Sequence, residues 1–271
     1  MKKKIKQVLL KNILSEKEKI KLKKTTPFIP KGFVSIKNTS ENDIFIAGYP
    51  KSGNTWMQNL VAGVQYGIET SLLPDRLTQE LVTDVHGKKH YKRFSDCMFF
   101  KTHDLPAENM KRVIHLVRDG RDVMASYYAM NKAMNKNTTL EEMIVHGKNI
   151  YPSKWYEHTK QWIKNPYNAD ILIVKYEDLI KDPFTQMKTV LEFAKLERTD
   201  EVINRVVKGN SFQEMKRKEM EFGWNNENWD PKQDFIRKGK VGSYKNEIPE
   251  DLVRIFESES YNELKYFNYL Q

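Results

Sequence analysis

Residues 44–56 read Ile-Phe-Ile-Ala-Gly-Tyr-Pro-Lys-Ser-Gly-Asn-Thr-Trp, and this stretch decides the fold of the chain. Its four leading apolar residues are typical of a strand buried on both faces, as in a parallel sheet. A turn that contains glycine, proline and serine follows, and a helix is predicted to begin near Thr55. Such a strand–loop–helix unit directs backbone N–H groups and the positive end of a helix at one point, which favours a phosphate.

The loop differs from an ordinary ATP- or GTP-binding loop in the position of its lysine. Gly48 and Gly53 have the spacing of the Walker A motif, but Asn54 stands where that motif requires lysine. The lysine lies inside the loop instead, at position 51. A tight strand–helix turn with incidental polar residues is the alternative interpretation, and the combination of lysine, serine, threonine and tryptophan argues against it.

Further apolar runs predict the rest of the sheet. They cover residues 98–100, 113–117 and 171–174, and helices are expected over 55–66, 122–131 and 182–194. Strands that alternate with helices predict βαβ units. We therefore predict an α/β fold: a single P-loop-like domain with a central parallel sheet flanked by helices. Residues 69–96, 132–155 and 217–236 lack strong periodicity, and we expect long loops or short helices there, placed over the site.

Composition limits the function classes. The chain has 271 residues and one cysteine, Cys97, which excludes an internal disulfide framework and indicates a cytoplasmic location. The net charge is +10, but ten lysines and two glutamates in residues 1–24 contribute +8 of it. We therefore divide the chain into a basic N-terminal segment, 1–24, and a nearly neutral domain, 25–271, and expect no nucleic-acid partner. No apolar run approaches the length of a transmembrane segment, and the basic segment is either a solvated helix or a weak binder of anionic lipid.

Residues 49–56 closely resemble the Tyr-Pro-Lys-Ser-Gly-Thr-Thr-Trp loop of the cytosolic sulfotransferases. In that family the loop binds the 5′-phosphosulfate of 3′-phosphoadenosine 5′-phosphosulfate (PAPS), the sulfate donor, whose product is 3′-phosphoadenosine 5′-phosphate (PAP). Asn54 departs from the pattern but keeps a side-chain donor. The resemblance implies that the loop residues that bind the cofactor are Lys51, Ser52, Gly53, Asn54, Thr55 and Trp56.

Other segments resemble the same family in the same order along the chain. Arg118 and Ser126 match the pair that clamps the 3′-phosphate, although ion pairs of Arg118 and Arg121 with Asp119 and Asp122 are an alternative for either arginine alone. The C-terminal Arg-Lys-Gly segment has Ser-Tyr at 243–244 where the family has Asp-Trp. Asn210 stands where threonine is usual. The resemblance implies that the remaining cofactor-binding residues are Tyr176, Phe212, Arg237, Lys238 and Gly239.

The catalytic prediction rests on Lys101-Thr102-His103, which follows the expected strand at 98–100. The carboxyl ends of such strands carry the ligand site in open α/β sheets. The segment resembles the family motif whose histidine is the base, with Asp104 where leucine is common. A neutral imidazole can remove the acceptor proton near pH 7, Lys51 can follow the charge of the leaving group, and Lys101 would support the sulfuryl oxygens. No metal is required.

Three other candidates have simpler interpretations. We expect His115, inside an apolar run, to be structural. His86 and His90 lie four residues apart but lack flanking carboxylate or thiol ligands, which argues against a zinc site. Cys97 is expected to be a small buried hydrophobic residue.

The expected partner is a small-molecule acceptor, either a phenol or other alcohol or a cationic, nitrogen-rich compound. The cationic class follows from residues 219–234, where five carboxylates and three aromatic rings would cover the acceptor pocket and attract a positive charge. Two other functions stay open at this point. One is a P-loop kinase of a nucleoside or small molecule, and the other is a non-catalytic binding module that uses the lysine-rich segment.

Overall fold

The centre of the protein is a parallel sheet whose strands meet at one edge. A computed structural model describes residues 31–224 and 228–270 of the chain. Its main sheet has the order β3-β5-β2-β6-β7, and every neighbouring pair is parallel. The strands are β2 (Ile44–Gly48), β3 (Thr83–Asp84), β5 (Phe99–Thr102), β6 (Arg112–Val117) and β7 (Asp170–Lys175). The predicted α/β class with a central parallel sheet is confirmed.

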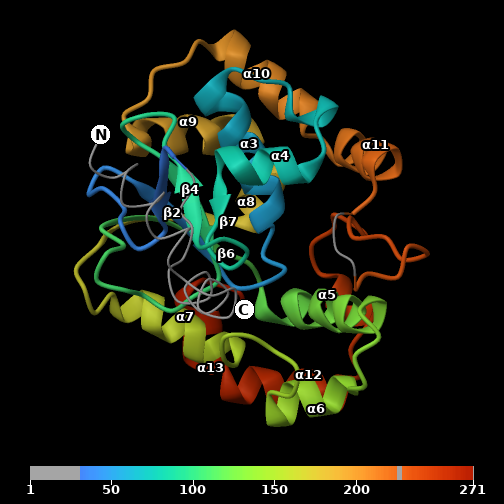
Figure 1. Ribbon diagram of the computed structural model, residues 1–271. Helices are drawn as coiled ribbons and strands as arrows, with labels where there is room; N and C mark the ends of the chain where they lie inside the picture. Colours follow the sequence, from blue (N-terminus) through green and yellow to red (C-terminus); the bar gives the residue numbers. More distant parts are fainter. Residues whose placement is uncertain (1–30, 225–227, 271) are drawn as a thin grey trace, which may run out of the picture.

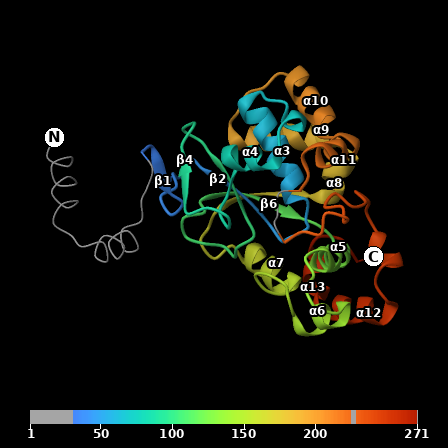
Figure 2. The same cartoon turned by 45° about the vertical axis from the view of Figure 1, so that its right-hand side comes forward.

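Helices cover both faces of this sheet (Figure 1). The helices on one face are α3 (Asn54–Tyr66), α4 (Asp75–Leu81), α9 (Pro183–Ala194) and α10 (Asp200–Gly209). Those on the other side are α5 (Gly120–Ala133), α6 (Leu140–His146), α7 (Trp155–Lys164), α12 (Glu250–Glu259) and α13 (Tyr261–Tyr266). The turned view in Figure 2 shows the same two groups with α8 (Tyr176–Lys181) and α11 (Phe212–Phe222) on the α3 side.

Strand β2 shows why the sequence forms three layers. Ile44 and Ile46 belong to the apolar cluster under α3, α9 and α10, whereas Phe45 and Ala47 belong to a cluster on the opposite face that includes Trp162 of α7. Successive side chains of a strand point to opposite faces, so an unbroken apolar run fits a strand that is covered on both sides.

The strand order places the site. β2 lies between β5 and β6, so the chain leaves β2 toward one side of the sheet and later returns to the other. This reversal creates a crevice at the carboxyl end of β2, where open α/β sheets bind ligands. In the register of the sheet Ala47 pairs with Thr102, and Gly48 pairs with Leu116. Residues that follow β2, β5 and β6 therefore meet at one edge.

The prediction for residues 69–96 was wrong in one respect, because two strands lie there. β3 adds an edge strand to the main sheet, and β4 (His90–Lys92) pairs with β1 (Phe33–Ser35) in a separate antiparallel pair. Strands of two and three residues are too short to show a hydrophobic period. The short helices in the three segments are the 3₁₀ turn η1 (Thr70–Leu72), α4, α6 and the last turns of α11. A second 3₁₀ turn, η2 (Ser243–Asn246), lies further along the chain.

The predictions for the basic N-terminal segment and for membrane spans have different outcomes. The basic segment 1–24 lies outside the described residues, so its predicted character stays a prediction. Among residues 31–224 and 228–270, no helix has both the length and the apolar composition needed to cross a membrane.

Candidate active site

The loop after β2 is built around two glycines. A Cβ at Gly48 would lie 2.4 Å from Oδ1 of Asn54, and Gly53 has a φ of 93°, which disfavours other residues. The Asn54 side chain fills the space over Gly48 and donates from Nδ2 to the Tyr49 carbonyl at 2.9 Å. The side-chain donor expected for a ligand is thus used to hold the loop itself.

One cavity of about 660 Å³ lies at this edge of the sheet. It brings together segments that are far apart in the sequence: the β2–α3 loop, the ends of β5 and β6, α5, α8, α11 and the stretch before η2. Every site residue predicted from the sequence lines it except Ser52, which is buried beneath the loop. The predicted residues that line it are Lys51, Gly53, Asn54, Thr55, Trp56, Lys101, His103, Arg118, Ser126, Tyr176, Phe212, Arg237, Lys238 and Gly239.

The cavity is strongly cationic. Six of its lining residues in the described part of the chain are lysine or arginine, and none is aspartate or glutamate; the six are Lys51, Lys101, Arg118, Lys208, Arg237 and Lys238. Burial, followed by the neighbouring charges of Arg118 and Arg237, lowers the pKa of Lys51 to about 7. A cavity that depresses the charge of its own lysine is suited to a polyanionic ligand.

Arg118 connects three parts of the cavity. Its Nη1 donates to the Lys51 carbonyl at 3.1 Å, its Nη2 donates to the Lys240 carbonyl at 3.2 Å, and its guanidinium lies 4.4 Å from the ring centre of Tyr176. Arg121, by contrast, donates to both Asp119 oxygens. Arg118 also pairs with Asp122, with Nη2 3.9 Å from Oδ2, so the ion-pair alternative applies to both arginines. Of the two, only Arg118 also lines the cavity.

The C-terminal Arg-Lys-Gly segment folds back over the cavity. Arg237 Nη1 and Lys238 Nζ both contact the Glu247 carboxylate, the lysine at 2.9 Å. Gly239 has a φ of 58°, and a Cβ there would lie 2.4 Å from the ring of Phe212. The glycine is needed because the backbone packs directly on the aromatic ring.

Two aromatic residues, Trp56 and Tyr176, meet beside the β2–α3 loop. Tyr176 packs so closely on Gly53 that a Cβ there would lie 2.7 Å from the tyrosine ring. Trp56 meets Tyr176 edge to face, with ring centres 6.0 Å apart, and donates from Nε1 to the Asn210 carbonyl at 2.8 Å. These rings leave faces on which a planar base can lie.

His103 is fixed by backbone contacts. Its Nδ1 lies 2.6 Å from the Gly48 carbonyl oxygen. A carbonyl can only accept, so Nδ1 carries the proton and Nε2 keeps its lone pair. Burial, followed by the Lys101 charge, lowers the pKa of His103 to about 3. The imidazole is therefore neutral at physiological pH.

Lys101 has a partner that the sequence did not reveal. Its Nζ lies 2.5 Å from Oδ2 of Asp84, a β3 residue that lies next to Lys101 in the sheet. Lys101 lines the cavity, so its charge acts there, but its side chain is held at the sheet edge.

Sequence reasoning missed several other residues of this region. Phe235 lies under the Lys51 ammonium, 4.1 Å from Nζ to the ring centre, and stacks on Trp224 with ring centres 3.4 Å apart. Glu247, the partner of Arg237 and Lys238, follows the recognised motif. The available signal for Phe235 was its place in an aromatic-rich stretch directly before the Arg-Lys-Gly segment. The only signal for Glu247 was its nearness in the sequence to Arg237 and Lys238.

The proposed acidic lid has its carboxylates turned away from the cavity. Glu219 accepts the backbone N–H groups of Phe235 and Ile236, and Glu221 and Asp234 pair with Arg217 and Lys216 of α11. None of the described carboxylates of 219–234 lines the cavity; Glu227 lies outside the described residues. The lining residues beside the cations are apolar instead: Met130, Met134, Trp224, Trp229 and Phe235.

The remaining histidines and the cysteine lie outside the cavity. His115 is buried in β6 and stacks on Trp162, with ring centres 5.5 Å apart. Cys97 is half-buried, and burial raises the pKa of its thiol. His86 does not approach His90 but stacks on His103. Among the described residues, no group of three or more possible metal ligands occurs.

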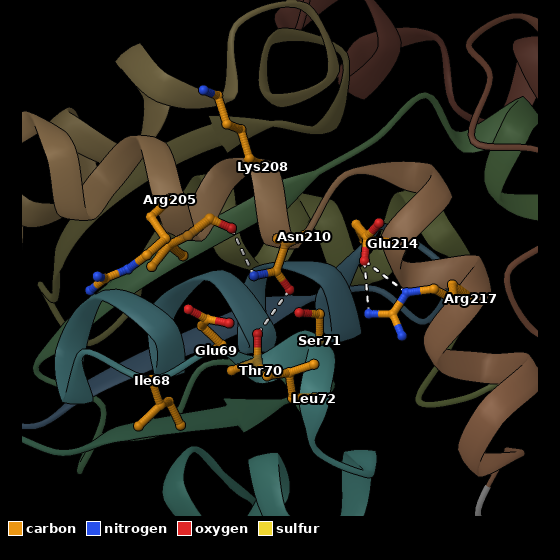
Figure 3. Close-up of a pocket in the computed structure, with 12 residues that line it drawn as sticks. Ile68, Glu69, Thr70, Ser71, Leu72, Arg205, Lys208, Asn210, Glu214 and Arg217 are labelled. Atoms are coloured by element: carbon orange, nitrogen blue, oxygen red, sulfur yellow. Dashed lines mark hydrogen bonds and ion pairs between the residues drawn. The ribbon is translucent and has the colours of Figure 1, made fainter.

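A second cavity of about 380 Å³ lies between η1, α10 and α11. Figure 3 shows Asn210 at its centre, where Oδ1 accepts from the Thr70 hydroxyl at 3.0 Å. Lys208 and Asn210 line both cavities. These two residues therefore belong to the boundary of both cavities.

The parallel sheet, the phosphate-type loop and the cationic cavity together define an α/β protein with a site suited to an anion. Residues 41–266 match the model of the sulfotransferase domain family, so the chain belongs to the sulfotransferase family and is a sulfuryl-transferring enzyme.

Curated relatives agree over most of their length. The chain is 29% identical to sulfotransferase 1E1 of Mus musculus, over 83% of this chain and 84% of that protein. It is 28% identical to 3-beta-hydroxysteroid sulfotransferase of Cavia porcellus, over 76% and 78% of the two chains.

Solved structures share the fold. Retinol dehydratase in complex with androsterone and the inactive cofactor PAP aligns with a TM-score of 0.65 and 20% identity, over 84% of this chain and 82% of that one. Mouse sulfotransferase SULT7A1 complexed with PAP aligns with a TM-score of 0.61 and 20% identity, over 84% and 86%.

Proposed function

We propose that this sulfotransferase moves the sulfuryl group of PAPS to the hydroxyl of an apolar small molecule, with His103 as the base. The observation that carries the proposal is the cavity lining, in which six lysine and arginine residues adjoin apolar and aromatic side chains and no described lining residue is a carboxylate. A bisphosphate nucleotide matches the first part and an apolar alcohol matches the second. Asn54 in place of the Walker lysine, together with the family match, favours this donor over ATP.

Unpaired buried donors support the fit of the donor nucleotide. Arg118 and Arg237 line the cavity, and the Nε of each is buried without a hydrogen-bond partner. Buried polar groups are normally paired, so these two atoms match a ligand with several acceptor oxygens. When bound, PAPS would supply an electrophilic sulfuryl group and a bisphosphate leaving group.

Each group of residues would hold one part of that nucleotide. By resemblance, the loop 51–56 would hold the 5′-phosphosulfate, and Arg118, Ser126 and residues 237–239 the 3′-phosphate. Tyr176, Phe212 and Trp56 supply ring faces for the adenine. Solved relatives that contain PAP make the same ligand the natural candidate here.

The chain's own residues can provide the proton transfer. The free Nε2 of His103 is oriented by the Nδ1 contact with Gly48 and can accept the proton of an acceptor hydroxyl. Lys51 sits in the loop with a φ of 72°, and its ammonium rests on Phe235, from which it can move toward a developing negative charge. A bound polyanion would oppose the Lys101 charge that lowers the pKa of His103, and so would make the imidazole a stronger base.

An apolar acceptor agrees better with the cavity than a cationic one. The described carboxylates of 219–234 are paired with α11 and with backbone N–H groups, so they are not free to recognise a cation. The aromatic and methionine side chains remain. Androsterone and retinol, the molecules bound by retinol dehydratase in its solved complexes, are apolar alcohols.

Calorimetry and turnover together test the proposal. We expect PAP to bind the chain and ATP with Mg²⁺ to bind much more weakly. His103→Ala should lower the turnover of a phenol by ~10²-fold or more, the usual contribution of a general base, with PAP affinity retained. Full turnover by this variant would exclude His103 as the base.

A further inference from the structure

A second histidine lies against the proposed base. The rings of His86 and His103 are nearly parallel, at an interplanar angle of 15° with centres 5.4 Å apart. The backbone N–H of His103 donates to Nε2 of His86 at 2.9 Å, although 17 residues separate the two in sequence. A ring nitrogen that accepts a backbone proton must be unprotonated, so this contact requires neutral His86.

The parallel pairing of β3 and β5 creates this arrangement. Asp84 of β3 lies beside Lys101 of β5, and His86 and His103 each follow these residues by two positions. One oxygen of Asp84 accepts the His86 backbone N–H at 3.0 Å, and the other contacts Lys101 Nζ at 2.5 Å. The same carboxylate therefore holds the backbone of His86 and the side chain next to His103.

Four titratable groups surround the His86 side chain and its backbone. Besides His103 and Asp84 these are Asp104, with Oδ1 3.9 Å from His86 Nε2, and Tyr151, whose ring meets His86 edge to face at 5.3 Å. The Tyr151 hydroxyl donates to Asp104. Once protonated, His86 Nε2 could only donate, and Asp104 is the carboxylate within its reach.

We propose that His86 is a positioning residue for His103. In its neutral form it accepts the His103 backbone N–H and supports the imidazole by stacking. The role in turnover rests on the proposed function, because it assumes that His103 removes the acceptor proton. The hydrogen bond between the two residues does not depend on that assumption.

The first test needs no donor or acceptor. In ¹⁵N-labelled protein we expect the His103 backbone amide resonance to move upfield in His86→Phe, because the hydrogen bond to His86 Nε2 is lost while a stacked ring remains. His86→Gln keeps an acceptor oxygen, so in that variant the resonance should stay close to its position in the unmodified chain. An amide resonance unchanged in His86→Phe would overturn the proposal.

The second test measures a single turnover of PAPS and a phenol, so that product release does not contribute. His86→Phe keeps a flat ring but has no acceptor, and we expect its rate to fall ~10- to 100-fold, the effect of a slightly misplaced catalytic group. His86→Gln keeps an acceptor for the His103 backbone N–H, so its rate should stay within about threefold of the unmodified chain. PAP affinity should be unchanged in both variants.

Control variants separate this proposal from the proposed function. His90→Phe, in the β1–β4 pair and without contact to His103, should leave the rate unchanged. If His103→Ala is inactive while His86→Phe is fully active, the positioning role fails and the proposed function stands. If His103→Ala is fully active, the base assignment fails, and the backbone amide resonance of residue 103 still decides whether His86 holds that backbone.

Discussion

Replacing Arg118 with alanine removes the side chain that links the two phosphate-type segments of the cavity. In the protein its guanidinium donates to the Lys51 carbonyl of the β2–α3 loop and to the Lys240 carbonyl of the C-terminal segment. Its Nε is buried and unpaired. If this nitrogen and its neighbours face the 3′-phosphate, the variant should lose affinity for ligands that carry that phosphate.

The expected loss follows from the burial of the group. Truncating one partner of a buried, hydrogen-bonded charge pair costs about 2–5 kcal/mol, which at ~1.4 kcal/mol per factor of ten is about a 30-fold to 4,000-fold weaker Kd for PAP. AMP lacks the 3′-phosphate, so its affinity should change by less than about fivefold. The difference between the two ligands is the quantity that isolates Arg118.

Calorimetric titration of PAP and AMP measures both values. Arg112→Ala is the matched control, because Arg112 begins the same strand, β6, and also donates to two backbone carbonyls, those of Asn42 and Phe193. It lies at the opposite end of the strand, so both affinities should be unchanged. Wild-type PAP affinity in Arg118→Ala, or an equal loss for PAP and AMP, would refute the assignment.

Three further predictions concern the loop, the C-terminal segment and the lid. The pKa of Lys51 is about 7, and a bound phosphate would raise it, so PAP binding should take up protons above pH 7 and weaken as the pH rises. Calorimetry in buffers of different ionisation enthalpy measures this proton uptake, and Lys51→Met should remove it. Gly239→Ala should weaken PAP binding at least ~10-fold, because its Cβ would overlap an aromatic ring. Gly67 has a similar positive φ but open space around it, so Gly67→Ala should lower the unfolding free energy by only about 1 kcal/mol in thermal denaturation. Glu219→Ala should raise the KM of the acceptor several-fold, because the backbone N–H groups of residues 235–236 lose their acceptor. Glu221 forms only an exposed ion pair with Arg217, so Glu221→Ala is the control in the same steady-state assay and should leave this KM unchanged.

The sequence predicted the parts of the fold that carry long apolar signals. The run at Ile44–Ala47 is unbroken because β2 is covered on both faces, and the same holds for β6. β3 could not be found in this way, since its two residues, Thr83 and Asp84, contain no apolar side chain. Its place in the sheet depends on pairing with β5, a contact between segments that the local pattern does not encode.

The candidate site divides along the same line. Motifs that follow single strands singled out Lys51, His103 and Arg118, and all three line one cavity. The partners of these groups were not predictable, because they come from other segments: Asp84 reaches Lys101 through the sheet, and Glu247 reaches Arg237 through the fold of the C-terminal loop. The residue type indicates a possible role, but the neighbouring charges that shift its pKa come from segments distant in the sequence and depend on the fold.

The most direct measurement is the transfer of labelled sulfuryl from [³⁵S]PAPS to an apolar phenol by the purified chain, with His103→Ala and [γ-³²P]ATP in parallel. We expect label on the phenol from PAPS, ~10²-fold less label with His103→Ala, and no label from ATP. Absence of transfer from PAPS, with label appearing on the acceptor from ATP, would contradict the proposed sulfuryl transfer.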